Sequence, residues 1–188
     1  MGISAVAFRF AESTDAENVA ALHVDSWRRH YRGAYSDAFL DGDVAAERQA
    51  VWSSRLAAPN PSAATVLAEI DGQLAGFVHV AFDDDEQWGS LVDNLHVAGD
   101  RQRHGIGSAL IIRAAQAVAD HAAAKSMYLW VLGQNTSAQA FYASHGGTFA
   151  ERTFVLQPGA SSSHLNGNPE KIRCVWPDVH EMLGAARA

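Results

Sequence analysis

Apolar positions in the first third of this chain recur at the period of a strand and then at the period of helices. The run Ala5–Phe10 predicts a first strand, and the sequence Thr14-Asp-Ala-Glu17 after it reads as a capping box. Helical spacing then predicts a helix with these residues on its inner side: Ala16, Val19, Ala20, His23 and Trp27. A second helical region follows the break at Gly33, with Ser36 or Asp37 and later Asp43 as its starts, and residues 59–62 end it.

The middle of the chain alternates strand-like and helix-like runs. Thr65–Ile70 and Gln73–Phe82 flank Asp71-Gly72, a strong signal for a two-residue hairpin. Gly89–Val97 predicts a further strand, and Gly105–Ala123 has the apolar face of an amphipathic helix. Met127–Leu132 is almost continuously apolar, which is typical of a strand covered on both faces.

The last part contains a short helix after Asn135 and two strands that we expect to be antiparallel, Thr148–Leu156 and Lys171–Trp176. Between these strands, Gln157–Pro169 is rich in Ser, Gly and Asn and predicts a mobile loop. The tail beyond Pro177 can either fray or dock. The order of elements, βα(α)βββαβαββ, predicts an α+β (mixed α/β) fold with helices packed on a mixed sheet.

Composition limits the class of protein. The chain has 188 residues, of which 48% are apolar, so we expect one globular domain over residues 1–188, with 177–188 as its tail. The formal net charge of −7 argues against general nucleic-acid binding, because such binding depends on Lys and Arg neutralising phosphates. The nine histidines are scattered without metal-ligand spacing, so no metal is expected.

The single cysteine, Cys174, allows no internal disulfide and suits a reducing compartment. We interpret it as a small strand residue, because no catalytic motif surrounds it. Neither a signal-peptide pattern nor a bilayer-spanning run is found, so we expect a cytoplasmic protein that does not enter a membrane.

The segment Asp100-Arg-Gln-Arg-His-Gly-Ile-Gly-Ser-Ala-Leu110 carries the strongest chemical signal. It follows an apolar strand and opens a helix, and Gly105 and Gly107 allow a tight turn without a Cβ facing a ligand. The first N–H groups of a helix lack internal partners and attract anions, so this turn predicts a pyrophosphate site. A Walker loop is disfavoured because no Lys follows Gly107, and a dinucleotide fingerprint would need a third Gly.

Two motifs in this order resemble the GNAT family of N-acetyltransferases. The first is Gln102-x-x-Gly105-x-Gly107 within the run from Leu95 to Leu110, and the second is Asn135-Thr-Ser-Ala-Gln-Ala-Phe-Tyr142 with its continuation to Phe149. Arg103 departs from the resemblance, because the family often has Gly there, and Thr148 is an insertion before Phe149. The likeness covers most of the chain and is tightest over residues 91–149.

The resemblance implies a GNAT fold and an acetyl-CoA donor. The fold has a central, mostly antiparallel sheet of six to seven strands, in which the parallel strands ending near Val97 and Leu132 separate to admit the donor. By resemblance, the backbone of residues 95–97 holds the pantetheine, and the N–H groups of residues 105–108 hold the pyrophosphate, beside Gln102, Arg103 and His104. The expected cofactor-binding residues are therefore Leu95, His96, Val97, Gln102, Arg103, His104, Gly105, Ile106, Gly107, Ser108, Asn135 and Tyr142. Arg103 can also simply solvate a surface, Asn135 can be a plain helix cap, and Tyr142 can be a core aromatic residue.

The chemistry that the resemblance implies is direct attack of an amine on the thioester. An alkyl amine is mostly protonated near neutral pH, so a group must take its proton. Asp93 and His96 are the candidate bases, acting directly or through water, and strand alternation would place them on opposite faces. Tyr142 would lie near the sulfur and protonate the departing thiolate.

Acceptor-binding residues are sought among the early aromatic side chains. Trp27, Tyr31 and Tyr35 are spaced at i, i+4 and i+8, which predicts one face of a helix. We expect Trp27 to pack in the core, and Tyr31 and Tyr35 to line the acceptor site. The predicted function is N-acetylation of a small-molecule or peptide amine. The alternatives are an acyl-CoA-binding module without catalysis and, less favoured, a P-loop protein. A homodimer paired through Lys171–Trp176 is also a prediction.

Overall fold

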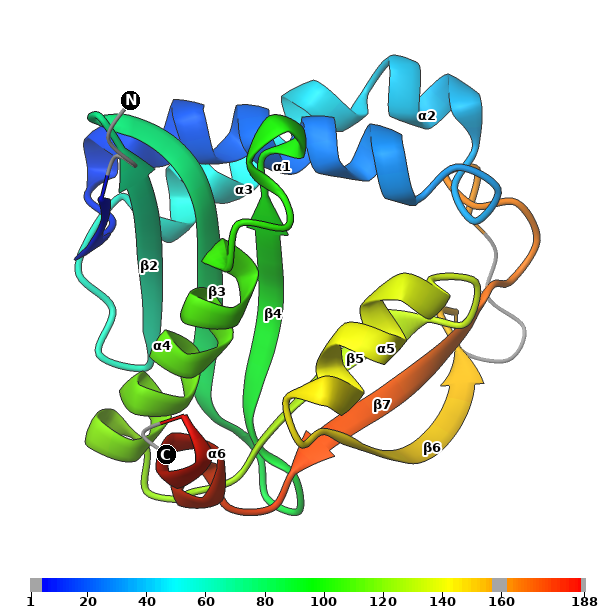
Figure 1. The fold of residues 1–188 in the computed structure, drawn as a ribbon. Helices are drawn as coiled ribbons and strands as arrows, with labels where there is room; N and C mark the ends of the chain where they lie inside the picture. Colours follow the sequence, from blue (N-terminus) through cyan, green and yellow to red (C-terminus); the bar gives the residue numbers. More distant parts are fainter. Residues whose placement is uncertain (1–4, 157–161, 187–188) are drawn as a thin grey trace.

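One mixed sheet of seven strands organises the molecule, in a computed structural model that describes residues 5–156 and 162–186. The strand order is β1-β2-β3-β4-β5-β7-β6, and every neighbouring pair is antiparallel except β4 and β5. The strands are β1 (Val6–Phe10), β2 (Ala63–Ile70), β3 (Gln73–Asp85), β4 (Gly89–Val97), β5 (Met127–Leu132), β6 (Thr148–Phe154) and β7 (Glu170–Trp176). The expected α+β fold with one parallel pair is confirmed (Figure 1).

Helices cover both faces of this sheet. They are α1 (Ala16–His30), α2 (Asp37–Asp41), α3 (Val44–Arg55), α4 (Ile106–His121), α5 (Thr136–Ser144) and α6 (Val179–Ala185), with short 3₁₀ turns η1 (Ser13–Asp15) and η2 (Gly99–Arg101). Helices α1 and α3 pack together over one face, while α4 covers β2, β3 and β4 on the other face. Within the described residues, no helix is both long enough and apolar enough to cross a lipid bilayer.

The β2–β3 hairpin forms where the sequence predicts it. Asp71 and Gly72 have φ angles of 52° and 75°, so both central residues adopt the left-handed conformation of a tight hairpin turn. The register from Ile70 and Gln73 outward places Val66 opposite Val78 and Leu67 opposite Phe77. Leu67 and Phe77 therefore face α1 and α3, while Val66 and Val78 face α4.

The predicted helix starts are confirmed in one region and wrong in another. Ser36 caps α2 by accepting a 3.3 Å hydrogen bond from the Phe39 N–H, and α3 begins after Asp43. The capping box predicted over Thr14–Glu17 is wrong, because the Asp15 side chain makes the capping hydrogen bond instead. Its carboxylate accepts a 2.7 Å bond from the Glu12 N–H and is also held by Arg9.

The C-terminal tail docks. Helix α6 packs against α4, with Val179 and Met182 buried in the core between the helices and the sheet. Cys174 lies on β7 as expected, and burial raises the pKa of its thiol to about 12, so it stays protonated at neutral pH.

The strand edge predicted for dimer pairing does not exist. β7, which contains Lys171–Trp176, is hydrogen-bonded to β5 on one side and to β6 on the other, so it has no free edge. The edge strand on this side of the sheet is β6, on which Phe149 and Phe154 are exposed. The idea of a homodimer stays a prediction, and its proposed interface is wrong.

Candidate active site

The two parallel strands at the centre of the sheet separate soon after they meet. Their pairing joins Ser90 to Met127 and Leu91 to Tyr128 and ends there. Beyond Leu91, β4 continues to Val97 along its other neighbour, β3, while β5 diverges from it (Figure 1). The split leaves peptide groups of β4 without a strand partner, which is the opening that the sequence led us to expect.

A β-bulge lies on β4 at the beginning of this split. His79 pairs with Asn94 and Val80 with Val92, so Asp93 is an extra residue in β4. A bulge resets the alternation of side chains. The prediction that Asp93 and His96 lie on opposite faces is therefore wrong, because both contact the layer formed by α1 and α3.

Asp93 is held at the split by an ion pair. Its Oδ2 accepts a 2.6 Å hydrogen bond from Arg55 at the end of α3 and another of 2.6 Å from the Asn94 side chain. About a third of the Asp93 side chain is exposed (34%), so solvent and ligands can still reach it.

His96 is a half-buried, neutral imidazole. Its Nδ1 lies 2.8 Å from the Ser26 hydroxyl of α1, and its ring packs at 4.6 Å against the ring of His23. Burial, helped by the nearby His30, lowers the pKa of His96 to about 3. The side chain is therefore uncharged at neutral pH and takes up a proton only at a considerable cost.

His23 and Trp52 are parts of this site that the sequence did not reveal as polar partners. The Trp52 indole N–H donates a 2.9 Å hydrogen bond to His23 Nδ1, which places the imidazole proton on Nε2. That Nε2 is buried without a hydrogen-bond partner among the described residues, as are Arg48 Nε and Arg55 Nη1 nearby. Regular spacing identified His23 as an inward-facing residue, but no local pattern could show what it contacts.

The loop between β4 and α4 makes two left-handed turns. Gly105 has a φ of 79° immediately before α4, and Arg103 has a φ of 63° two residues earlier. Arg103 thus adopts the backbone conformation that favours glycine, at the position where the resemblance expects one. The first helical bond runs from the Ala109 N–H to the Gly105 carbonyl, so the N–H groups of residues 106–108 have no partner within the helix.

The polar side chains of this loop lie near the split, but most of them already contact carbonyl groups of the loop or of the end of β4. The Gln102 amide lies 3.5 Å from the Val97 carbonyl, and His104 Nδ1 lies 2.8 Å from the Gln102 carbonyl. Arg103 is exposed. Leu95 and Val97 direct their side chains into the core beneath α4, so only their backbone is available at the split.

Helix α5 packs close to the start of α4. A Cβ added at Gly107 would lie 3.4 Å from the Phe141 ring, so a small residue lets the two helices approach here. Asn135 caps α5 through its Oδ1, which accepts a 3.1 Å bond from the Ala138 N–H. Tyr142 is half-buried on α5, and burial raises the pKa of its phenol well above the ordinary value, so the hydroxyl keeps its proton.

The early aromatic residues cluster, although they do not share a helix as predicted. Helix α1 ends at His30, and Tyr35 lies beyond Gly33, whose φ is 88°. The turn nevertheless brings the three rings together, with centroid distances of 4.9 Å for Trp27–Tyr31, 5.0 Å for Trp27–Tyr35 and 5.6 Å for Tyr31–Tyr35.

Three of the predicted residues converge around the split. Burial raises the pKa of Tyr31, and Tyr142, Tyr35 and Asp93 lie close enough to raise it further. Tyr31 at the end of α1, Tyr142 of α5 and Asp93 of β4 therefore influence one another electrostatically. By contrast, Arg103 and His104 lie in the loop before α4, where Arg103 is exposed and His104 Nδ1 contacts the Gln102 carbonyl.

Two surface cavities lie away from this convergence. One of about 630 Å³ is lined by Phe10, Leu56, Thr65, His79 and Phe82 with their neighbours. The other, of about 420 Å³, is lined by Ile112, His145, Trp176 and Met182 with theirs. The predicted site residues line neither cavity, so the split itself is the candidate site.

Comparison with known proteins gives consistent matches. A sequence model described as "Acetyltransferase (GNAT) family" matches residues 17–146. The chain is 29% identical over 176 residues to the uncharacterized N-acetyltransferase YuaI of Bacillus subtilis, covering 93% of this chain and 94% of that protein. It is 30% identical over 164 residues to the probable N-acetyltransferase Rv2775 of Mycobacterium tuberculosis, covering 86% and 92%. The crystal structure of the PaiA N-acetyltransferase of Thermoplasma acidophilum in complex with coenzyme A has the same fold, with a TM-score of 0.70 at 16% identity over 90% of this chain and 98% of that one.

Proposed function

Because this chain belongs to the acetyltransferase (GNAT) family, we propose that it transfers an acetyl group from acetyl-CoA directly to a primary amine of a small molecule or peptide. The observation that carries this proposal is the split between β4 and β5 beside the start of α4. There, unpaired strand backbone, unpaired helix N–H groups and a neutral tyrosine lie around one opening. The solved relative from Thermoplasma was crystallised with coenzyme A, which supports a donor of this class.

The turn at Gly105 binds the pyrophosphate of the donor. The N–H groups of residues 106–108 point out of the helix end without partners, and the positive end of the helix dipole favours an anion there. Arg103 adds a positive charge at the same turn. Gln102 and His104 hold the loop in shape through their bonds to the Val97 and Gln102 carbonyls.

The free backbone of β4 binds the pantetheine. Residues 95–97 have their side chains engaged elsewhere, so their peptide groups on the β5 side are available to the amides of the pantetheine chain. Asn135 uses its Oδ1 as a helix cap, and its amide nitrogen is the group that remains for the donor. The structural and ligand-binding roles of Asn135 are therefore compatible.

Tyr142 protonates the departing sulfur. In the reaction, the amine nitrogen bonds to the carbonyl carbon, the carbon–sulfur bond breaks, the amine loses a proton and the sulfur gains one. The Tyr142 phenol holds its proton at neutral pH and can donate it to a thiolate formed beside it, although burial raises its pKa and so makes it a weaker acid than a free phenol.

Asp93 receives the proton of the amine, directly or through water. His96 is the other candidate, but burial lowers its pKa to about 3, so its imidazole is a weak base. Asp93 lies at the bulge where the split begins, and its side chain is partly exposed. We assign His96 the role of supporting β4 from the α1 side, in addition to its backbone contact with the donor.

Tyr31 and Tyr35 line the acceptor side of the opening. Both are half-buried, and the pKa of each is raised by burial, so they present neutral phenols to the acceptor. Trp27 supports them from below as part of the cluster with Val24, Phe39, Leu40 and Val44. We further propose that residues 1–188 form a single catalytic domain.

Calorimetry with acetyl-CoA, followed by a thiol assay for CoA released with a panel of amines, tests this function. We expect binding, and CoA release that depends on the amine. Binding without release for any amine would favour the alternative of a non-catalytic acyl-CoA-binding module. Absence of heat with both acetyl-CoA and CoA would contradict the proposal as a whole.

A further inference from the structure

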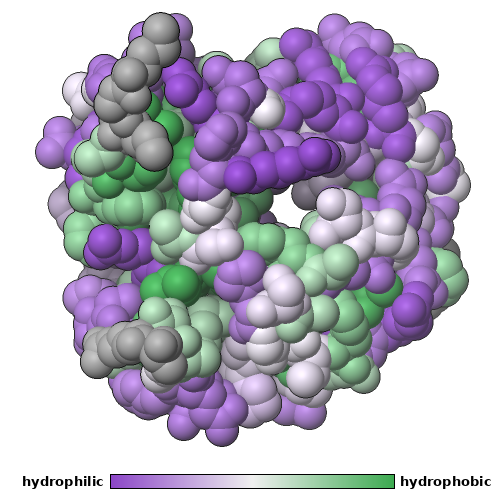
Figure 2. Space-filling view, viewed as in Figure 1, coloured by the Kyte–Doolittle hydropathy of each residue, from purple (hydrophilic) through white to green (hydrophobic). Residues whose placement is uncertain are grey.

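The larger of the two cavities lies at the β1 edge of the sheet. β1 ends at Phe10, while β2 begins at Ala63 and pairs with β1 only from Val66 onward, so the first part of β2 has no strand partner on this side. This part of β2 lines the cavity of about 630 Å³, together with residues 55–61 at the end of α3. Figure 2 shows a separate opening near the middle of the molecule, where β4 and β5 diverge. The cavity and the split are therefore two different sites.

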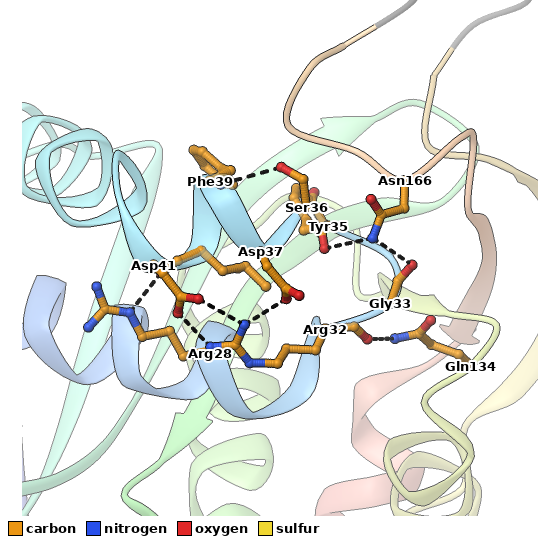
Figure 3. Close-up of polar contacts among 11 residues, drawn as sticks. Arg28, Arg32, Gly33, Tyr35, Ser36, Asp37, Phe39, Asp41, Gln134 and Asn166 are labelled. Atoms are coloured by element: carbon orange, nitrogen blue, oxygen red, sulfur yellow. Dashed lines mark hydrogen bonds and ion pairs between the residues drawn. The ribbon is translucent and has the colours of Figure 1, made fainter.

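One buried polar group in this cavity has a nitrogen without a partner. Elsewhere, polar groups close to the surface are well paired, as the turn after α1 shows (Figure 3). There the Asn166 Nδ2 donates to the carbonyls of Gly33 at 3.3 Å and Tyr35 at 3.1 Å. His79 lines the cavity and is 7% exposed, and its Nδ1 lies 2.8 Å from the Thr65 hydroxyl. Among the described residues, no hydrogen bond reaches its Nε2. A buried group left in this way gains from a ligand that bonds to it.

The imidazole of His79 selects the kind of polar group that a ligand would bring. Burial lowers the pKa of His79 to about 4, so the ring is neutral at pH 7. A neutral imidazole has one donor nitrogen and one acceptor nitrogen, and the Thr65 hydroxyl can bond to either kind. Nε2 therefore either donates or accepts. A hydroxyl group on the ligand can do both, so it matches whichever tautomer is present.

The charged groups of the cavity favour a neutral ligand. Glu12 and Arg55 both line it, with opposite charges, and Arg55 already donates a 2.6 Å bond to Asp93. The lining therefore has no single charge that would select an ion. An ion would also have to lose its hydration in a space with apolar walls, which is costly without a partner charge.

Much of the remaining wall near His79 is apolar. Ala11 and Leu56 pack against the buried cluster formed by α1, α3, β2 and β3, and both line the cavity. Residues 57–59, which are two alanines and a proline, continue this wall after α3. Walls of this kind bind a hydrocarbon body by burying its surface. The volume lies within the range of about 300–1,000 Å³ that is usual for sites of small molecules.

We propose that this cavity is a second ligand site, which binds a neutral aromatic alcohol. The rings of the ligand lie against Leu56 and Ala11, and its hydroxyl bonds to His79 Nε2. Thr65 holds the imidazole in place through Nδ1. The site goes beyond acyl transfer and does not depend on it.

Equilibrium dialysis with 2-naphthol and naphthalene tests the proposal, because the two probes share their rings and differ by one hydroxyl. For the wild-type protein we expect a Kd for 2-naphthol at least fivefold below that for naphthalene. His79→Leu replaces the imidazole by an apolar side chain, so this ratio should fall at least threefold while naphthalene still binds. Saturating CoA should change the Kd for 2-naphthol less than twofold, because the two sites are separate.

His121→Leu is the matched control. His121 also lines the cavity, but it is exposed and its ring lies 5.7 Å from that of Phe82, which packs against the α4 side of the sheet. This variant should keep the wild-type ratio of the two Kd values.

A measurement on the wild-type protein needs no variant. The ¹⁵N resonance of His79 Nε2 should shift with 2-naphthol and stay in place with naphthalene. No binding of 2-naphthol, equal affinities for the two probes, an unchanged ratio in His79→Leu, an unmoved Nε2 resonance, or displacement of 2-naphthol by CoA would each overturn the proposal.

Discussion

Replacing Arg103 by Gly should make the protein more stable and its binding of CoA weaker. Arg103 has a φ of 63°, and a left-handed conformation costs a residue with a Cβ about 1–2 kcal/mol. Glycine removes that strain but loses about 0.5–1 kcal/mol of backbone entropy on folding. The net change expected in the free energy of unfolding is therefore an increase of up to about 1.5 kcal/mol.

The effect on binding has the opposite sign. The Arg103 side chain is exposed at the turn where we place the pyrophosphate. A single charge pair at about 4 Å in water is worth about 1 kcal/mol, or roughly a fivefold change in Kd. Salt screens such a pair, since the Debye length is about 10 Å at 0.1 M, so the difference between the two proteins should shrink as salt is added.

Urea unfolding and calorimetry with CoA at low and high salt measure the two effects separately. Arg103→Lys is the control, because it keeps both the charge and the strained backbone, and it should behave nearly as the wild type in both assays. A Gly variant that binds CoA with wild-type affinity at low salt would refute the role of Arg103 at the pyrophosphate. A Gly variant without a gain in stability would show that the turn at this position is unstrained.

Two further predictions concern the protonation of buried groups. Tyr142→Phe should lower kcat at least 100-fold, as expected for loss of a general acid, with nearly unchanged acetyl-CoA affinity; unchanged turnover would remove Tyr142 from the mechanism. Burial lowers the pKa of His79 to about 4 and that of His96 to about 3, while both titrate near 6.5 when unfolded. The unfolded chain therefore binds more protons than the folded chain below pH 6.5. As the pH falls from 6.5 toward these folded pKa values, the free energy of unfolding should decrease by about 1.4 kcal/mol per pH unit for each histidine. Equal urea midpoints at pH 7.5 and 5 would contradict this.

Local rules predicted most of the fold. The pattern of apolar residues predicted every described strand in order, and turn chemistry placed the hairpin at Asp71-Gly72 and a helix start at Ser36 or Asp37, of which Ser36 is the cap. These features depend on residues within a few positions of one another, which is the range over which sequence patterns act. The capping box at Thr14 failed for a related reason. Asp15 has a partner, Arg9 of β1, which competes with the local pattern.

The geometry of the site was harder to predict, because a single extra residue in β4, which forms a β-bulge, changes it. The alternation rule assumes an uninterrupted strand, and under it Asp93 and His96 diverge. The extra residue at Asp93 turns both toward the α1 layer. Nothing in the sequence from Ser90 to Val97 marks a bulge, since the register depends on how β3 pairs with β4. The grouping of Trp27, Tyr31 and Tyr35 was predicted from helical spacing, and that reason was wrong. Tyr35 reaches the other two rings through the turn at Gly33, after α1 has ended.

The polar side chains packed beneath β4 are better explained by a functional role than by a gain in stability. Burial lowers the pKa of His23 and of His96, so neither imidazole carries the charge that it could carry in water. His23 Nε2 also has no hydrogen-bond partner among the described residues. A buried donor without a hydrogen bond costs about 1–3 kcal/mol, and an apolar pair in the same space would avoid that cost. His96, however, holds β4 against α1 through Ser26, and His23 links α1 to α3 through Trp52. β4 is the strand that carries Asp93 and faces the proposed donor. The layer thus fixes the position of β4 and leaves both imidazoles uncharged beneath it.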